Sequence, residues 1–185
     1  RSKELSVNAI TEDENGNIFV GTDRNLLRID PAGHLVRVNP SGTAVAGFTG
    51  SFIRTLHFDN NGLLWVGTTN GLFYYSPGNN SINEILLPLG QNQSKEVFDI
   101  LRDDDGRLWV ATYSGGVMII DPLTLSVTHL DLQPFYERTE TVRSISKGLL
   151  GDYWIGTRGG LYIYTRRKEV MGLFNPVDSD NHSLT

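Results

Sequence analysis

The sequence contains no cysteine and no long apolar run. The lack of cysteine excludes disulfides, thiolate metal ligands and cysteine nucleophiles. No stretch of 18 apolar residues is present, so the sequence predicts no membrane-spanning helix. The first residues, RSKELS, lack the apolar stretch of a signal peptide, so no export signal is predicted within this stretch.

Positive charge is also scarce. Lysine and arginine number 16 against 21 aspartates and glutamates, which gives a formal net charge of -5. Binding to a phosphate backbone requires a basic face, and the one basic run is Arg166, Arg167 and Lys168. We interpret that run as a solvated hairpin turn and expect no nucleic-acid partner for this segment.

One segment recurs four times along the chain. The copies are IFVGTDRNLLRID at 18–30, LWVGTTNGLFYYS at 64–76, LWVATYSGGVMIID at 108–121 and YWIGTRGGLYIYT at 153–165. A small residue anchors each copy, and these anchors lie 46, 44 and 45 positions apart: Gly21, Gly67, Ala111 and Gly156. A large aromatic residue stands two positions earlier in each copy: Phe19, Trp65, Trp109 and Trp154. This regular spacing indicates tandem structural repeats.

Each repeat has the pattern of four short strands. Residues 53–58, IRTLHF, alternate apolar and polar side chains and end at the turn sequence DNNG. In the strand that follows, Leu64 and Val66 point to one face and Trp65 to the other. Both faces of the sheet are therefore apolar, and we expect neighbouring sheets of the same kind to cover them.

A four-stranded antiparallel unit of this length, repeated in tandem, predicts an all-β fold, the β-propeller. We expect residues 1–185 to form one propeller segment, with blades at about 1–50, 51–94, 95–139 and 140–185. The large aromatic residue of each repeat would fill the space between blades, and the small anchor residue would leave room for it.

The chain ends lead us to expect a fragment of a larger propeller of about seven blades. Four blades in an arc would expose the apolar faces of the first and last sheets. We therefore expect this segment to pack against the remaining blades of the same protein and, when isolated, to self-associate.

The repeated pattern D-x-x-G-x-L-W-[IV]-G-T-x-x-G-L resembles the two-component regulator propeller repeat. DNNGLLWVGTTNGL at 59–72 matches it fully, and DDDGRLWVATYSGGV at 103–117 nearly so. The first copy replaces tryptophan with Phe19 and the second glycine with Asn25, and the fourth copy lacks the turn aspartate. These departures affect packing and turns and leave the resemblance intact.

The resemblance implies a sensor role. Repeats of this kind occur in the periplasmic part of inner-membrane hybrid two-component proteins, ahead of kinase, receiver and DNA-binding parts. Such proteins sense oligosaccharides and regulate genes for polysaccharide utilisation. On this reading the segment is a non-catalytic ligand-input region, while the whole protein is a sensor histidine kinase. A propeller that binds a protein partner is the alternative, and a propeller lyase or glycosidase is less favoured.

The motifs that could indicate catalysis are weak. Asp103 and Asp105 precede Gly106 but lack the other ligands of a calcium loop, so we interpret them as turn residues. Ser144 and Lys147 match S-x-x-K on a strand, whereas that motif works at the start of a helix. The four histidines show no metal-ligand spacing. We expect no catalytic residue, no metal site and no cofactor.

Topology places the turns after the second and fourth strands of every blade on one face. The loops there are long and vary between copies, as expected of recognition loops on a constant scaffold. Aromatic faces bind the C–H surfaces of sugars, and planar polar groups bind their hydroxyls. The candidate ligand-binding residues on this face are Tyr113, Arg158, Arg24, Asn70, Phe135, Tyr136 and Arg138.

Overall fold

The structure is a computed structural model that describes residues 6–130, 132, 141–165, 167 and 169–174. In this part of the chain, sixteen strands form four sheets of four strands each. The first sheet contains β1 (Val7–Glu12), β2 (Ile18–Thr22), β3 (Leu26–Ile29) and β4 (Leu35–Arg37). The second contains β5 (Ile53–Phe58), β6 (Leu64–Thr68), β7 (Gly71–Ser76) and β8 (Ser81–Ile85). The third contains β9 (Val97–Arg102), β10 (Leu108–Thr112), β11 (Val117–Ile120) and β12 (Val127–His129). The fourth contains β13 (Val142–Lys147), β14 (Tyr153–Thr157), β15 (Gly160–Tyr164) and β16 (Val170–Phe174).

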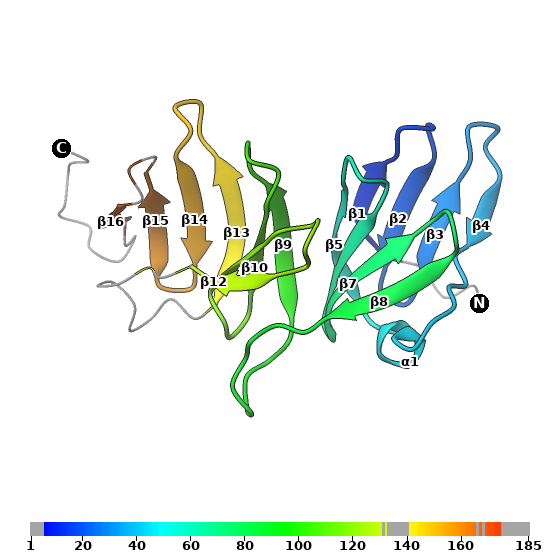
Figure 1. Cartoon of the computed structure of the whole chain (residues 1–185), viewed down its shortest axis with the longest axis horizontal. Helices are drawn as coiled ribbons and strands as arrows, with labels where there is room; N and C mark the ends of the chain where they lie inside the picture. Colours follow the sequence, from blue (N-terminus) through cyan, green and yellow to red (C-terminus); the bar gives the residue numbers. More distant parts are fainter. Residues whose placement is uncertain (1–5, 131, 133–140, 166, 168, 175–185) are drawn as a thin grey trace.

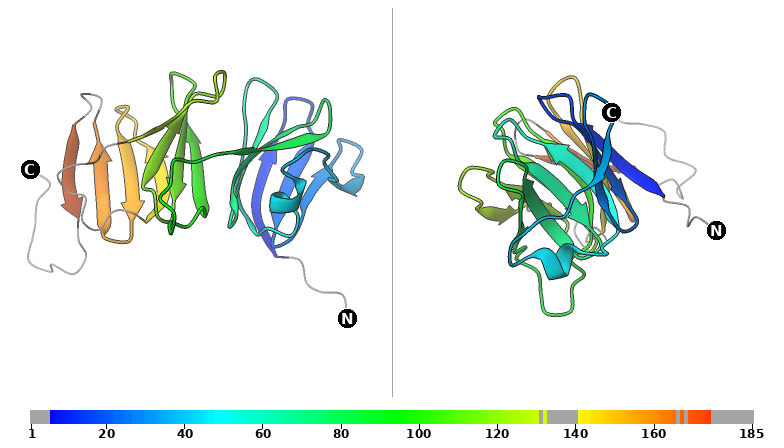
Figure 2. Two further views of the ribbon diagram at one scale, coloured as in Figure 1. Left: turned by 60° about the horizontal axis from the view of Figure 1, so that its bottom comes forward. Right: turned by 90° about the vertical axis from the view of Figure 1, so that its right-hand side faces the viewer.

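Within each sheet, strands that follow one another in sequence pair antiparallel, so every sheet is a simple meander. The four sheets follow one another along the long axis of the molecule in chain order (Figures 1 and 2). The first strands of successive sheets, β1, β5, β9 and β13, pack against each other. The predicted all-β architecture of four antiparallel four-stranded propeller blades is therefore confirmed for the described residues.

Apolar cores lie between successive blades. Leu64 and Val66 pack against Phe19 of the first blade, whereas Trp65 between them packs against Leu108 of the third. Both faces of one strand are thus buried, as the alternating apolar pattern predicts. In the next junction the ring of Trp109 stacks on that of Tyr153, with centroids 4.0 Å apart and planes 13° apart. Such aromatic contacts bury a large area and hold neighbouring blades together.

The small anchor residues lie where adjacent blades come closest. A Cβ atom added at Gly21 would lie 2.4 Å from Cγ2 of Ile53, the first residue of β5. At Gly67 the corresponding atom would lie 2.7 Å from Cγ1 of Val97, the first residue of β9. Real Cβ contacts do not reach such distances, so the approach of the next blade requires glycine at both positions.

The turn after each first strand is held by an aspartate in three of the blades. The indole Nε1 of Trp65 donates to Oδ2 of Asp59 at 2.7 Å, and the backbone N–H groups of Asn61 and Leu63 donate to Oδ1 at 2.8 and 3.0 Å. Asp103 accepts from Nε1 of Trp109 in the same way, at 3.0 Å. The aspartate thus fixes the hairpin turn and the orientation of the tryptophan at once.

The first and fourth blades satisfy this turn differently. The side chain of Phe19 has no hydrogen-bond donor, and Oδ2 of Asp13 accepts instead from Nδ2 of Asn17 at 2.8 Å. In the fourth blade Gly148 stands at the aspartate position, and a Cβ there would lie 2.8 Å from Nε1 of Trp154. The indole therefore occupies the space that the aspartate side chain takes elsewhere.

The connection between the first and second blades, residues 39–51, is more regular than the long variable loops that the sequence predicts after the fourth strands. It contains the short helix α1 (Val45–Phe48), and Ser41 forms a parallel bridge with Ser81 of β8. The ring of Phe48 packs edge-on against that of Phe73, with centroids 5.6 Å apart. This connection is consequently part of the second blade's packing.

In the described residues, no helix has the length and apolar character needed to cross a membrane.

Candidate functional site

The first strand of every blade has a bulge at the same place. The register with the second strand shifts between Val7 and Ala9 in β1, and the same shift recurs at the start of β5, β9 and β13. The extra residue in each bulge is Asn8, Arg54, Phe98 or Arg143. A bulge turns a side chain away from the alternating pattern of its strand, and such features gather near functional sites.

The bulged residues of three successive blades meet because their strands pack against each other. The guanidinium carbon of Arg54 lies 4.8 Å from the ring centroid of Phe98, and that of Arg143 lies 4.3 Å from the same centroid. Two cations therefore share one aromatic ring. We call this cluster, together with Glu96 and Tyr113, the inner rim.

One carboxylate of the inner rim is paired with one of the two arginines. Nε of Arg54 donates to Oε1 of Glu96 at 2.7 Å, and Nη2 of Arg54 donates to the same oxygen. The side chains of Arg54 and Glu96 are only 32% and 16% exposed, and the guanidinium also lies 5.1 Å from the ring centroid of Phe52. Arg54 is thus fixed by an ion pair and two aromatic rings.

Tyr113, one of the residues predicted from the sequence, belongs to the inner rim. Its ring lies 6.1 Å from that of Phe98, and its backbone N–H donates to the carbonyl oxygen of Glu96 at 2.9 Å. The side chain is 37% exposed, so one part of the ring is free to contact a ligand. Arg158 follows β14 as Tyr113 follows β10, and its N–H donates to the carbonyl oxygen of Thr141 at 3.1 Å.

The other predicted residues are more dispersed. Arg24 is exposed in the turn after β2, with its nearest ion-pair contact to Asp23 at 3.9 Å. Asn70 uses Nδ2 to donate to the carbonyl oxygen of Gly47 at 3.2 Å, so it holds the connection that precedes β5. The structure does not gather these two residues with the inner rim. Phe135, Tyr136 and Arg138 lie outside the described residues.

The turns that carry these residues are held by their threonines. In the second blade, Oγ1 of Thr68 donates to the carbonyl oxygen of Gly71 at 3.0 Å and accepts from the N–H of Asn70 at 3.0 Å. Thr22, Thr112 and Thr157 donate to carbonyl oxygens of their own turns in the same manner. The threonine satisfies the turn internally, which leaves the variable side chains of the turn available for other contacts.

Sequence reasoning missed Arg54, Phe98, Arg143 and Glu96. A signal for the first three is present, since each lies two positions before a repeated apolar residue, such as Leu56 or Ile145. The position before it is valine or isoleucine in every copy, while this one changes among asparagine, arginine and phenylalanine. Variation at one position inside a constant strand marks a side chain that the scaffold does not need.

A second candidate is a pocket of about 380 Å³ between the third and fourth blades. It lies at the opposite edge of the blades, where the β9–β10 and β13–β14 turns meet the ends of β12 and β15. Its lining includes Trp109, Ile119, Tyr153 and Tyr164. Burial raises the pKa of Tyr153 and Tyr164, and the charges of Asp103 and Asp104 raise that of Tyr153 further. Both phenols are therefore neutral at physiological pH.

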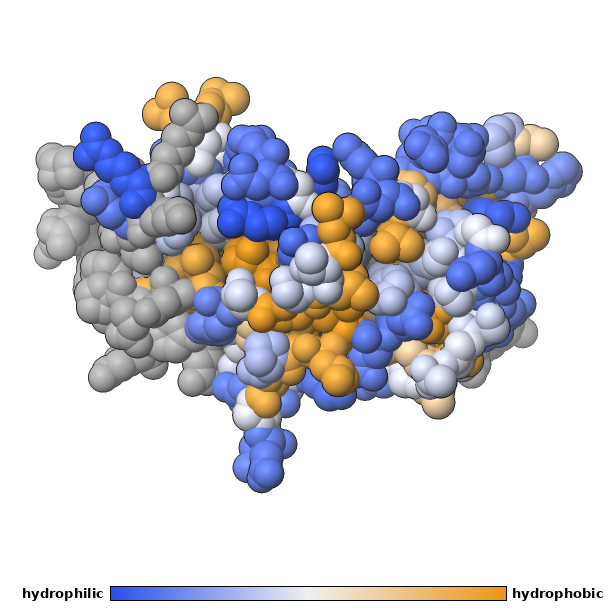
Figure 3. All heavy atoms as spheres, in the orientation of Figure 1, coloured by the Kyte–Doolittle hydropathy of each residue, from blue (hydrophilic) through white to orange (hydrophobic). Residues whose placement is uncertain are grey.

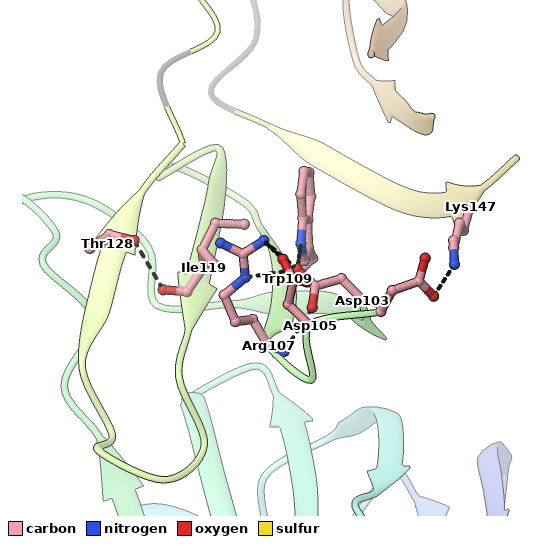
Figure 4. Close-up of polar contacts among 8 residues, drawn as sticks. Asp103, Asp105, Arg107, Trp109, Ile119, Thr128 and Lys147 are labelled. Carbon is pink, nitrogen blue, oxygen red and sulfur yellow. Dashed lines mark hydrogen bonds and ion pairs between the residues drawn. The ribbon is translucent and has the colours of Figure 1, made fainter. Parts of the chain in front are cut away.

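The charges around this pocket are paired with one another (Figure 4). Arg107 donates from Nε to Asp103 and from Nη2 to Asp105, each at 2.9 Å, and Lys147 contacts Asp104. Figure 3 shows apolar side chains over the neighbouring β11–β12 hairpin, whose turn exposes Leu123 at 78%. The pocket therefore offers an aromatic surface with little unpaired charge among the described residues.

In the described part of the chain, no three histidine, aspartate or glutamate side chains come together in a way that could hold a metal ion. Burial lowers the pKa of His57, which favours the neutral imidazole within the second blade.

The model of the two-component regulator propeller family matches residues 3–24, 47–70 and 92–114. These segments contain the first two strands of three blades, including the turn aspartate and the large aromatic residue of each repeat, Phe19, Trp65 or Trp109; we call this aromatic position the aromatic slot. The three matched segments are two-component regulator propeller repeats. The fourth blade, with Gly148 in place of the turn aspartate, lies outside the matched segments.

Solved structures share the arrangement of these propeller repeats. The extracellular domain of BT3049 from B. thetaiotaomicron, assigned as a hybrid two-component system, superposes with a TM-score of 0.74 at 21% identity. That alignment covers 93% of this chain and 25% of the other. The extracellular domain of BT4673, from the same organism, gives a TM-score of 0.77 at 20% identity, covering 96% of this chain and 23% of the other. The chain thus spans about a quarter of the length of these domains.

Propellers of other kinds show the same fold. Virginiamycin B lyase from Staphylococcus aureus superposes with a TM-score of 0.72 at 14% identity, over 96% of this chain and 58% of the lyase. At such low identity the likeness concerns the fold alone. No curated protein matches the sequence.

Proposed function

We propose that these propeller repeats form part of the ligand-input region of a hybrid two-component signalling protein. In this role the segment is non-catalytic and lies in the periplasm, as part of an inner-membrane protein whose kinase domain is elsewhere in the chain. The observation that carries the proposal is the match of three blades to the two-component regulator propeller family. The likeness to the extracellular domains of BT3049 and BT4673 supports it.

We further propose that the ligand is an oligosaccharide and that its binding regulates genes for polysaccharide utilisation. The inner rim supports this proposal because it combines a partly exposed aromatic ring, Tyr113, with guanidinium groups on Phe98. Aromatic faces contact the C–H surface of a sugar, while guanidinium N–H groups donate to its oxygens. Arg54, Phe98 and Arg143 of the rim lie on paired strands, which lowers the entropic cost of binding.

The test is calorimetric titration of the intact signalling protein with a panel of oligosaccharides from plant and host polysaccharides. We expect at least one member to bind, and Tyr113→Ala or Arg158→Ala to weaken that binding at least a few-fold. Leu149→Ala is a suitable control because Leu149 is fully exposed in the turn at the opposite edge. Unchanged affinity in both variants would remove Tyr113 and Arg158 from the site. If no saccharide binds but a protein partner is retained, the interaction platform is the better assignment.

A further inference from the structure

The inner rim carries more positive than negative charge among the described residues. Glu96 directs Oε1 at Arg54, and both Nε and Nη2 of that arginine donate to it. Arg143 is exposed on the surface and contacts the ring of Phe98 without a described carboxylate in an ion pair with it. The whole chain, by contrast, has a formal net charge of -5. The rim thus gathers positive charge locally in a protein that is acidic overall, which favours the binding of an anionic group there.

Asp99 follows Phe98 in β9, and both of its carboxylate oxygens accept hydrogen bonds from backbone N–H groups. Oδ1 accepts from the backbone N–H of Ile100 at 2.9 Å, and Oδ2 accepts from the N–H of Ile145 at 2.9 Å. The second bond joins β9 to β13 across the blade junction, two residues after Arg143. Asp99 therefore fixes the position of Arg143 relative to Phe98, while both of its oxygens are bound to backbone N–H groups.

The stacking on Phe98 also orders the guanidinium of Arg143. At 4.3 Å from the ring centroid, the flat group is held by the attraction between a cation and the negative face of the ring. A guanidinium in contact with a ring face still has N–H donors for a planar anion, and a carboxylate can accept two parallel hydrogen bonds from them. Little side-chain entropy is lost on binding, because the arginine is already ordered.

Tyr113 lies on the same ring as the two arginines. Its contact with Phe98 and its 37% exposure place an aromatic surface beside the cationic group. We propose that the inner rim binds a carboxylate-bearing saccharide, with the carboxylate on Arg143 and the sugar ring on Tyr113. This inference rests on the proposed function, since it names the class of oligosaccharide that the sensor recognises.

The experiment compares acidic oligosaccharides with neutral counterparts of identical length. The probes are trigalacturonate, a glucuronic-acid-substituted xylooligosaccharide and a hyaluronan tetrasaccharide, each alongside its carboxyl-reduced form. Titration of the intact protein should show at least one acidic probe binding about tenfold or more tightly than its reduced form. Its affinity should fall as salt is raised, because the contact involves an exposed charge.

Arg143→Gln should lower the affinity for that acidic probe about tenfold and leave the reduced form unchanged, because only the charge contact is lost. Arg37→Gln is the matched control, since it removes one equal charge from β4, an exposed outer strand. Thermal unfolding of both variants checks that the fold is retained.

Equal affinity for the acidic and reduced forms, or an Arg143→Gln variant with unchanged acidic preference, would overturn the inference. In that case binding of neutral saccharides would still support the proposed function. If neither acidic nor neutral saccharides bind, the proposed function fails as well, so the two failures are distinguishable.

Discussion

At the scale of single residues, the most consequential contact is the one between the turn aspartate and the tryptophan of the same blade. Asp59 is 3% exposed and receives three hydrogen bonds, one of them from the indole of Trp65. A buried carboxylate requires such donors, because its desolvation is costly when it lacks them. The tryptophan therefore contributes both packing between blades and a polar contact within its own hairpin.

Trp65→Phe should destabilise the protein by about 2 kcal/mol, because Oδ2 of Asp59 loses its indole donor while staying buried. The free energy of unfolding, measured with urea, tests this expectation. Trp154→Phe is the control for the hydrogen bond, since the fourth blade has Gly148 in place of the aspartate. An equal decrease in the free energy of unfolding of both variants would show that lost packing alone explains the effect.

The first blade suggests a compensating substitution. There Phe19 occupies the aromatic slot, and Nδ2 of Asn17 supplies the donor to Asp13 at 2.8 Å. Leu63 stands at the position of Asn17 in the second blade. In a double-mutant cycle, Trp65→Phe and Leu63→Asn should therefore be coupled. The free energy of unfolding of the double variant should exceed the value expected from the two single variants by about 1 kcal/mol. Strict additivity would contradict this exchange of donors.

At the scale of strands, the sequence predicts the blades well because each strand repeats the same local pattern four times. The two-faced burial of Leu64, Trp65 and Val66 follows directly from alternation along a strand. The bulges at Arg54 and Phe98 could not be predicted in this way. They depend on how the first strand meets both its hairpin partner and the next blade, which is a tertiary property.

The same limit applies to the candidate site. Tyr113 was identifiable because topology places the turns after second strands on one face. Arg143 was missed, because a residue inside a regular strand is expected to follow the alternation of its neighbours, and only its variation between the copies marks it. The bridge between Ser41 and Ser81 could not be predicted either. A polar stretch with glycines is predicted to be a loop as long as its partner strand is unknown.

The close approach of blades at Gly67 gives a prediction at this scale. Gly67→Ala should destabilise the protein by about 1–3 kcal/mol, because the new Cβ would lie 2.5 Å from Cγ2 of Thr55 and 2.7 Å from Cγ1 of Val97. The measurement is again the free energy of unfolding. Gly78→Ala is the matched control, as a Cβ there meets no atom within 4 Å. Equal free energies of unfolding for the two variants would mean that β6 and β9 can move apart at little cost in free energy.

At the scale of the whole molecule, the first blade differs from the others in what covers it. Ile10 occupies the same place in its blade as Ile100 and Ile145, which are 7% and 5% exposed in the cores between blades. Ile10 itself is 64% exposed. Among the described residues, no element covers the face of β1 that would receive a preceding blade, and its apolar side chains Val7 and Ile10 are exposed.

We propose that this open face is covered by a further blade in the intact protein and by a second copy when the 185-residue chain is isolated. Burial of exposed apolar area stabilises such an association by roughly 25 cal/mol per Å² before the entropic cost of pairing. Light scattering over a range of concentrations should therefore give a mass above that of the monomer. Ile10→Asp should shift the mass toward the monomer, because it places a charge in the paired face. Leu149→Asp introduces the same charge at a fully exposed turn and should leave the association unchanged. A monodisperse monomer for the unmodified chain would contradict the proposal, since an uncovered sheet face would then be stable in water without a partner.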